Sequence, residues 1–183
     1  LFNLGSRTGI DLPNVGTGIM HTADTMGPTE LACSAFGQGF TCTMIQEINA
    51  ICSVINGGYY YQPHLVSRIE DSNGTVVREM EPTLLKQTVS SSISEDIRSY
   101  MQSSVESGTS HYSKVNGYSS GGKTGTAEKF PRGNGKYLVS FVGFAPVDDP
   151  AVVIYVVVDE PNADRQDNSA YPQYIAQGML SGL

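Results

Sequence analysis

Two nearly continuous apolar stretches, YLVSFVGFA (137–145) and AVVIYVVVD (151–159), are separated only by the turn sequence PVDDP. Parallel strands need a crossover of about a dozen residues or more, so two strands this close along the chain are expected to pair antiparallel. Continuous apolar runs are typical of strands whose two faces are both buried. A further stretch, YSSGGKTGTAEKF (118–130), precedes them across the turn sequence PRGNGK. The sequence therefore predicts an antiparallel sheet built from these three stretches.

Three helices are expected around this sheet. Thr43 and Gln46 fit a capping box, and apolar residues at helical spacing follow them as far as an Asn-Gly-Gly sequence, which predicts a helix over 43–56. Apolar residues after a second Ser-x-x-Glu pattern predict a helix over 94–106, and a last helix is expected over 170–181. Helices that flank an antiparallel β-sheet define an α+β fold.

The remaining segments are read from their turn residues. The stretches YYYQPHLVSRIED (59–71) and TVVREMEP (75–82) flank the sequence Ser-Asn-Gly, and Asn-Gly between two strand-like runs indicates a hairpin. Turn-forming residues are spread throughout residues 1–40, so this part is expected to be irregular.

Length, charge and cysteine spacing exclude several classes of protein. The 183 residues have the length of one ordinary domain. The net charge of −7 argues against nucleic-acid binding, which needs a basic face. The longest apolar run is much shorter than the about 20 residues of a membrane helix. Cys33, Cys42 and Cys52 lack metal-ligand spacing and are expected to be small buried apolar residues, so we expect no metal and no cofactor. The chain does not begin with methionine, and we expect it to be part of a longer protein.

The first strand-like stretch contains glycines where a strand would normally carry packing side chains. Glycine contributes nothing to packing, but it lets another backbone approach closely. An exposed strand edge can accept an extended peptide as an added strand. The glycines therefore suggest a peptide-like ligand that lies alongside residues 122–126.

Strand alternation assigns chemistry to this stretch. Thr124 and Thr126 fall on one face, while Lys123 and the gap left by Gly125 fall on the other. Two hydroxyls on one face can donate hydrogen bonds to a carboxylate, and Lys123 supplies positive charge and a group for proton transfer. The backbone N–H of Thr126 is a candidate donor to a developing oxyanion. The spacing alone favours a Gly/Ser/Thr-rich turn that carries a solvated lysine, because a three-residue motif recurs by chance.

The wider context of the Lys-Thr-Gly sequence resembles a known family. Lys-Thr-Gly is a signature of β-lactamases and penicillin-binding proteins. Five further segments resemble that family in the right order, so that nearly the whole chain is covered. They are GIDLP (9–13), FGQGFTCTMIQEINAICSVINGG (36–58), QPHLVSRIED (62–71), VESGTSHY (105–112) and SFVGFAPVDDPAVVIYVVVDEP (140–161). The chain is similar to the C-terminal part of the transpeptidase domain of a class B penicillin-binding protein, of the cell-division or sporulation type.

The resemblance implies a fold, an activity and a set of site residues. The fold would be part of the penicillin-binding transpeptidase (β-lactamase-like) fold, an antiparallel β-sheet flanked by helices. Lys123 would be the conserved lysine near a nucleophilic serine. Thr124, Gly125 and Thr126 would bind the carboxylate of a D-Ala-D-Ala stem peptide or of a β-lactam, and the Thr126 N–H would form half of the oxyanion hole. The parent protein would cross-link peptidoglycan as a serine-type transpeptidase at the extracytoplasmic face of the bacterial membrane.

The sequence departs from the family pattern in two ways. Met44 stands where the family usually has proline, which we expect to affect only the start of a helix. More importantly, the sequence has no Ser-x-Asn, and its single Ser-x-x-Lys is Ser120–Lys123, whose lysine already belongs to Lys-Thr-Gly. We therefore expect residues 1–183 to lack the half of the domain that carries both motifs, to be inactive alone, and to self-associate or bind that missing half.

Two alternatives from other classes stay open. A serine β-lactamase or carboxypeptidase would share Lys-Thr-Gly but not the context at 36–58 and 140–161. A non-catalytic peptide-binding or partner-docking module would use the open strand edge without covalent chemistry.

Overall fold

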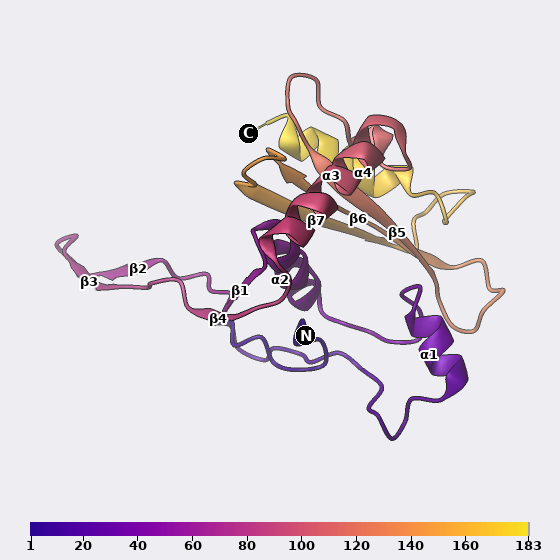
Figure 1. The fold of residues 1–183 in the computed structure, drawn as a ribbon, viewed down its shortest axis with the longest axis horizontal. Helices are drawn as coiled ribbons and strands as arrows, with labels where there is room; N and C mark the ends of the chain where they lie inside the picture. The colour runs from indigo at the N-terminus through magenta and orange to yellow at the C-terminus, as the bar shows by residue number, and fades with distance from the viewer. Residues whose placement is uncertain (183) are drawn as a thin grey trace. The chain divides into compact units, whose positions relative to one another are not determined.

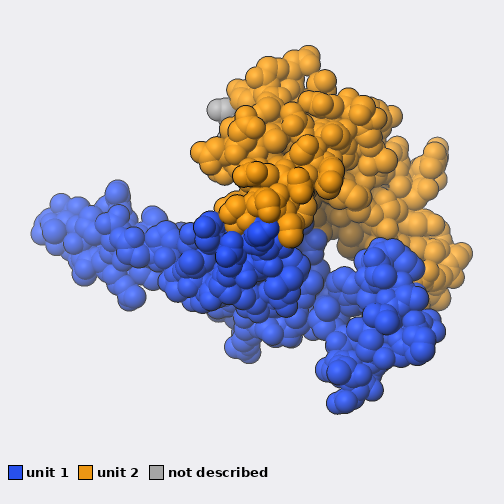
Figure 2. Space-filling model, in the orientation of Figure 1, with its two compact units in different colours: residues 1–54, 58–90 blue, residues 55–57, 91–183 orange. Residues whose placement is uncertain are grey.

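The computed structural model describes residues 1–182, in which two compact units can be distinguished. Unit 1 comprises residues 1–54 and 58–90, and unit 2 comprises residues 55–57 and 91–183 (Figure 2). Among the described residues, none of the helices has both the length and the apolar character that a membrane span requires.

Unit 2 contains the predicted three-stranded antiparallel sheet. Its strands are β5 (Gly121–Glu128), β6 (Tyr137–Ala145) and β7 (Val152–Asp159), in the order β5-β6-β7 (Figure 1). β6 is the central strand and is buried along most of its length, as its apolar sequence predicted. β7 is mostly only partly buried, so the expectation that both of its faces are buried was wrong. It is an edge strand, which pairs with β6 alone among the described residues.

Helices pack against this sheet. α4 (Ala170–Leu180) lies against β6 and β7, and α3 (Ser91–Ser107) lies next to β5 (Figure 1). A short 3₁₀ helix, η1 (His111–Ser113), contacts both of these helices. The core between α4 and the sheet consists of apolar side chains: Val115, Phe141, Ala145, Ile154, Ala176 and Leu180. The predicted α+β fold with an antiparallel sheet and flanking helices is therefore confirmed.

α3 begins three residues earlier than the capping pattern predicted. Ser94 is buried, and its hydroxyl oxygen accepts hydrogen bonds from the Gly57 N–H at 2.9 Å and from the Arg98 guanidinium at 3.3 Å. Arg98 also donates to the carbonyl of Ile55 at 2.8 Å. Buried polar groups need hydrogen-bond partners. Ser94 and Arg98 find theirs in residues 55–57, which are far away in sequence, so the sequence pattern does not reveal these contacts.

Unit 1 contains the predicted helix and hairpin. α2 (Met44–Ile55) is preceded by a capping box in which the Thr43 N–H donates to Gln46 Oε1 at 2.8 Å and the Gln46 N–H donates to Thr43 Oγ1 at 3.2 Å. The predicted hairpin is present as β2 (Arg68–Glu70) paired with β3 (Val76–Glu79). It continues into a second antiparallel pair, β1 (Tyr59–Tyr61) with β4 (Leu84–Gln87). β4 was not predicted, because its largely exposed residues show no alternation.

Two expectations for unit 1 were wrong. The segment 1–40 is not irregular throughout, since α1 (Pro28–Ser34) lies within it. This helix buries none of its residues, so it has no apolar stripe, and the proline at its first turn was its one sequence signal. The three cysteines are free thiols that are only partly buried, and the Cys42 thiol donates to the Glu47 carboxylate at 3.4 Å.

Candidate functional site

The Lys-Thr-Gly-Thr sequence lies in β5, which pairs only with β6 among the described residues and so has an open edge. Just beyond the strand, the Lys129 N–H donates to the Lys136 carbonyl at 2.9 Å, in the same register as the β5–β6 pairs. Backbone groups in an antiparallel strand alternate in direction, so odd-numbered residues of β5 face β6. The N–H and C=O groups of Thr124 and Thr126 therefore face the open edge.

The strand register places the predicted site residues on the two faces that alternation assigned. Thr124 is opposite Phe141, and Thr126 is opposite Val139. Both threonines therefore project on the face of the sheet that packs against α4, where Phe141 belongs to the core. Lys123 and Gly125 project on the other face. Thr126 is exposed and Thr124 is half-buried.

Lys123 reaches the open edge of β5 although its side chain starts on the opposite face from the two threonines. Its ammonium donates to the carbonyl of Thr124 at 2.6 Å. That carbonyl faces away from β6, so the lysine side chain bends around the border of the sheet. Lys123 is exposed in this chain, and its positive charge lies beside the backbone of Thr124.

The glycines of β5 have a packing role that the sequence did not predict. A Cβ at Gly121 would collide with the ring of Phe144, and a Cβ at Gly122 would collide with the ring of Phe141. At Gly125 the obstacle is the hydroxyl of Ser140, 2.5 Å away. These side chains, and the Val142 carbonyl 2.9 Å from the Gly122 position, all belong to β6, so the glycines make room for the neighbouring strand. The peptide-like ligand alongside residues 122–126 stays a prediction, and the edge beside Thr124 and Thr126 is open among the described residues.

Two residues outside the sheet contact β5, and the sequence reasoning did not single them out. Thr109 Oγ1 lies 3.4 Å from Thr124 Oγ1. The buried Ser110 donates its hydroxyl proton to the Gly122 carbonyl at 3.3 Å. The resemblance of VESGTSHY (105–112) to the family was a signal that this segment matters, but residues so far apart in sequence cannot be paired without a tertiary structure.

Charged side chains form ion pairs next to the end of β5 that follows Thr126. The Lys129 ammonium lies 2.7 Å from Glu160 and 3.0 Å from Asp159, and Lys136 lies 2.9 Å from Glu160. The hydrogen bond that Lys129 donates to Glu160, followed by the one that it donates to Asp159, raises the pKa of Lys129. The same contact with Lys129, followed by Lys136, lowers the pKa of Glu160. This exposed network joins the β5–β6 turn to the end of β7.

Neither metal ligation nor the helical Ser-x-x-Lys chemistry has support in residues 1–182. No cluster of metal-ligating side chains is found in that range. Lys123 lies in β5 and Ser120 directly precedes that strand, so the two residues do not share the face of a helix. Ser120 therefore lacks the helical geometry of a serine activated by the lysine of the next turn.

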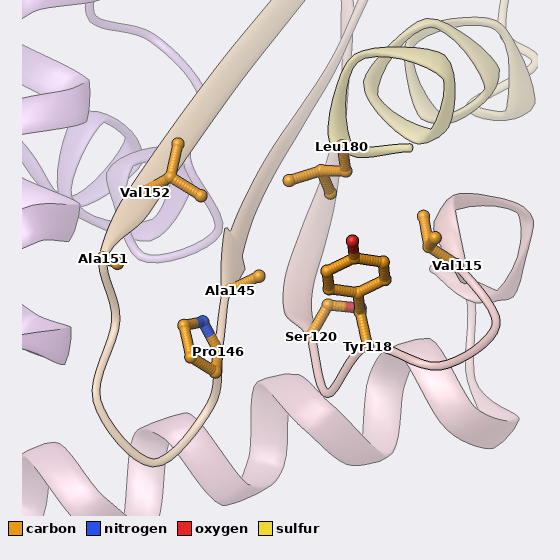
Figure 3. A pocket seen from close by; sticks show the side chains of 8 residues that line it. All are labelled: Val115, Tyr118, Ser120, Ala145, Pro146, Ala151, Val152 and Leu180. Atoms are coloured by element: carbon orange, nitrogen blue, oxygen red, sulfur yellow. The ribbon is translucent and has the colours of Figure 1, made fainter. Parts of the chain in front are cut away.

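Unit 2 also contains an apolar pocket of about 220 Å³ (Figure 3). Its lining is Val115, Tyr118, Ser120, Ala145, Pro146, Ala151, Val152 and Leu180. None of the predicted site residues contributes to this pocket, so it is distinct from the edge beside Thr124 and Thr126.

This arrangement agrees with what comparison of the sequence finds. The profile of the family described as "Penicillin binding protein transpeptidase domain" matches residues 1–180. The chain belongs to this family. Stage V sporulation protein D of Bacillus subtilis is 43% identical over 171 residues, which are 90% of this chain and 26% of that protein. Penicillin-binding protein PbpB of Mycolicibacterium smegmatis is 30% identical, over 87% of this chain and 26% of that protein. The chain thus spans about a quarter of the length of these relatives.

Solved structures of the same family share the fold. Penicillin-binding protein 3 of Mycobacterium tuberculosis without ligand superposes with a TM-score of 0.85 at 27% identity, covering 99% of this chain and 44% of that one. Its complex with ampicillin gives a TM-score of 0.85 at 26% identity, over 99% of this chain and 43% of that one. The resemblance to a class B penicillin-binding protein transpeptidase domain is therefore confirmed.

Proposed function

We propose that this chain forms the carboxylate-binding part of a peptidoglycan D,D-transpeptidase. The observation that supports this most directly is the open edge of β5. There Thr124 and Thr126 share one face, and the Lys123 ammonium lies at the Thr124 carbonyl. Two hydroxyl donors beside a cation suit the carboxylate of a D-Ala-D-Ala stem peptide or of a β-lactam.

Each residue of this edge has a proposed role. The hydroxyls of Thr124 and Thr126 donate to the ligand carboxylate, and Gly125 leaves a gap on the opposite face, beside Lys123. Lys123 supplies positive charge near the nucleophile and takes part in proton transfer. The Thr126 N–H faces away from β6, where it serves as one of two oxyanion donors. The solved relative in complex with ampicillin supports a β-lactam as ligand.

The reaction needs a nucleophile that residues 1–183 do not supply in the expected motif. We propose that these residues are the C-terminal portion of the transpeptidase domain, and that Ser-x-x-Lys and Ser-x-Asn lie elsewhere in the parent protein. The serine Oγ attacks the amide between the two D-alanines, and the terminal D-Ala leaves. The acyl group then passes from the serine to the amine of a neighbouring stem peptide, at the extracytoplasmic face of the bacterial membrane.

The test compares the parent protein with the chain alone. Both are incubated with a fluorescent penicillin, and the adduct is measured by intact mass. The parent protein is expected to form a stoichiometric adduct. The chain alone is expected to form none, because loss of the nucleophile alone lowers the rate of serine enzymes by several powers of ten. A stoichiometric adduct on the chain alone would contradict the proposal.

Substitution at the edge tests the proposed roles. In the parent protein, Thr126→Val is expected to slow acylation about tenfold or more, since a hydrogen bond to a charged group contributes about 1.5–3 kcal/mol. Thr75→Val, in the turn of the exposed β2–β3 hairpin, is the control and is expected to leave the rate unchanged. Reversible peptide binding that persists in Lys123→Ala and Thr126→Ala would instead favour a non-catalytic docking module.

A further inference from the structure

The segment between α3 and β5 carries side chains that contact the carboxylate-binding edge. Thr109 Oγ1 is 3.4 Å from Thr124 Oγ1, and Ser110 Oγ donates to the Gly122 carbonyl at 3.3 Å. Ser110 is fully buried, and it accepts a hydrogen bond from Ser104 Oγ at 2.8 Å. A hydroxyl has one proton. Ser110 accepts a hydrogen bond from Ser104, so its own proton is donated to the Gly122 carbonyl of β5.

A single buried side chain on α4 holds this segment in place. Gln173 is fully buried. Its Oε1 accepts from the Tyr112 N–H at 3.1 Å, while its Nε2 donates to the carbonyls of Thr109 at 3.0 Å and Ser169 at 2.9 Å. The amide orientation is fixed by these partners, because the acceptor must face the N–H and the two donors must face the carbonyls. Gln173 therefore fixes the backbone that carries Thr109.

The contact between Thr109 and Thr124 decides what the Thr124 proton can do. If Thr124 donates to Thr109, its hydroxyl proton is hydrogen-bonded within the protein and is not available to a ligand. If Thr109 donates to Thr124, the Thr124 proton stays free for a ligand carboxylate, and the two hydroxyls form a chain in which each bond polarises the next. Hydrogen bonds in a ligand-free site are often long and shorten in the complex, which fits the 3.4 Å separation.

We propose that Thr109 and Gln173 are positioning residues for carboxylate recognition. Gln173 holds the Thr109 backbone, and the Thr109 hydroxyl donates to Thr124 Oγ1, so that the Thr124 proton is reserved for the ligand. This inference rests on the proposed function, since it assigns a role to Thr124 as a donor to the carboxylate.

The experiment measures acylation of the parent protein by benzylpenicillin and by its methyl ester, which lacks the carboxylate. Thr109→Val is expected to slow acylation by the acid about fivefold, the effect of one ordinary hydrogen bond, and to leave the rate with the ester unchanged. Thr109→Ser keeps the hydroxyl and is expected to restore most of the rate. Equal loss with acid and ester, or no loss at all, would overturn the inference.

A second pair of variants tests the role of α4. Gln177 lies one turn after Gln173, and its amide donates to the Lys114 carbonyl at 2.6 Å. Gln173→Leu is expected to slow acylation by the acid more than by the ester, while Gln177→Leu is the matched control and is expected to show no such selectivity. Thermal unfolding of each variant separates loss of fold from loss of selectivity. Equal selectivity in both variants would contradict the assignment to Gln173.

The outcomes also separate this inference from the proposed function. If the unsubstituted parent protein is not acylated by benzylpenicillin, the proposed function fails, and the inference fails with it. If the parent is acylated and Thr126→Val slows the reaction while Thr109→Val does not, the proposed function stands and only the inference is overturned.

Discussion

The β5–β6 hairpin of unit 2 and the β2–β3 hairpin of unit 1 follow the same pairing rules but are stabilised differently. In β6 the side chains of Val139, Phe141 and Phe144 are at most 1% exposed. In β2 and β3 every residue is exposed. A two-stranded hairpin without a buried face is marginal in water. The β2–β3 hairpin therefore depends on hydrogen bonds at its turn and base, whereas the sheet of unit 2 depends on apolar burial.

Two carboxylates accept hydrogen bonds at the turn and at the base of the β2–β3 hairpin. The Asp71 carboxylate accepts from the N–H groups of Asn73 and Thr75 in the hairpin turn, at 2.8 and 3.0 Å. The Asp11 carboxylate accepts from the N–H groups of Leu65 and Val66 at 2.7 and 2.9 Å. The candidate site lies on β5 of unit 2, because a binding site needs residues whose positions are fixed by packing, and the exposed β2–β3 hairpin lacks such packing.

The largest expected effect tests the apolar side of this comparison. Phe141→Ala should lower the free energy of unfolding by about 3–5 kcal/mol, because it removes a buried aromatic ring and leaves a cavity. Val77→Ala in β3, where the side chain is 67% exposed, should change it by less than about 0.5 kcal/mol. Urea unfolding of the two variants measures both values, and similar losses would break the comparison.

Glycine substitution sharpens the role of close packing within unit 2. In Gly122→Ala the added methyl meets the Phe141 ring and the Val142 carbonyl, so a loss of about 1–3 kcal/mol is expected from overpacking. Gly178 in α4 has open space around its Cβ position. Gly178→Ala should stabilise by about 0.5–1 kcal/mol, since alanine favours a helix. Thermal unfolding measures the stability of both variants. A Gly122→Ala variant as stable as the unsubstituted protein would show that β5 and β6 can move apart to admit the methyl group.

A buried amide tests the polar side of the comparison. Gln46 is fully buried, and its Nε2 donates to the carbonyls of Ser6 and Thr17 at 2.7 and 3.0 Å. Gln46→Leu leaves those buried carbonyls without donors, so a loss of about 1–3 kcal/mol is expected. Gln102, whose amide donates to Glu106 at the surface, provides the control variant Gln102→Leu. Urea unfolding measures the free energy of unfolding of both variants. An equally small loss in both would contradict the stabilising role of the buried Gln46 amide in unit 1.

Lowering the pH should loosen the base of the hairpin. The backbone N–H groups of Val66 and then Leu65 lower the pKa of the Asp11 carboxyl below its ordinary value of 3.8. A folded-state pKa below the unfolded value gives stability that is present above the unfolded pKa and is lost as the pH falls through the folded one. Hydrogen exchange at these two amides should therefore lose protection below about pH 4. In Asp11→Ala the protection should be weaker and independent of this titration.

The smallest expected effect concerns thiol reactivity in unit 1. Burial, followed by the negative charge of Glu47, raises the pKa of the Cys42 thiol to about 11. The thiolate is the reactive form, so iodoacetamide at about pH 8 should label Cys42 slowly. Glu47→Gln should speed this labelling, as peptide mass spectrometry would show. An unchanged rate in that variant would mean that burial alone controls the thiol.

The sequence determined the features that arise from neighbours along the chain. Period-two alternation placed Thr124 and Thr126 on one face and Lys123 on the other, and the short turns required antiparallel strands. The Thr43–Gln46 capping box and the Asn-Gly turn marked a helix start and a hairpin. Each of these signals is local, because it depends only on residues a few positions apart and on the backbone geometry that they favour.

Tertiary structure alone decided which distant residues meet. It showed that Gly121 and Gly122 face the rings of Phe144 and Phe141, a role that strand pairing imposes and that composition cannot reveal. It also brought Thr109 to Thr124 and buried Gln173 beside the same segment. These contacts join residues far apart in sequence, and their energy comes from burial in a packed unit, which no local pattern encodes.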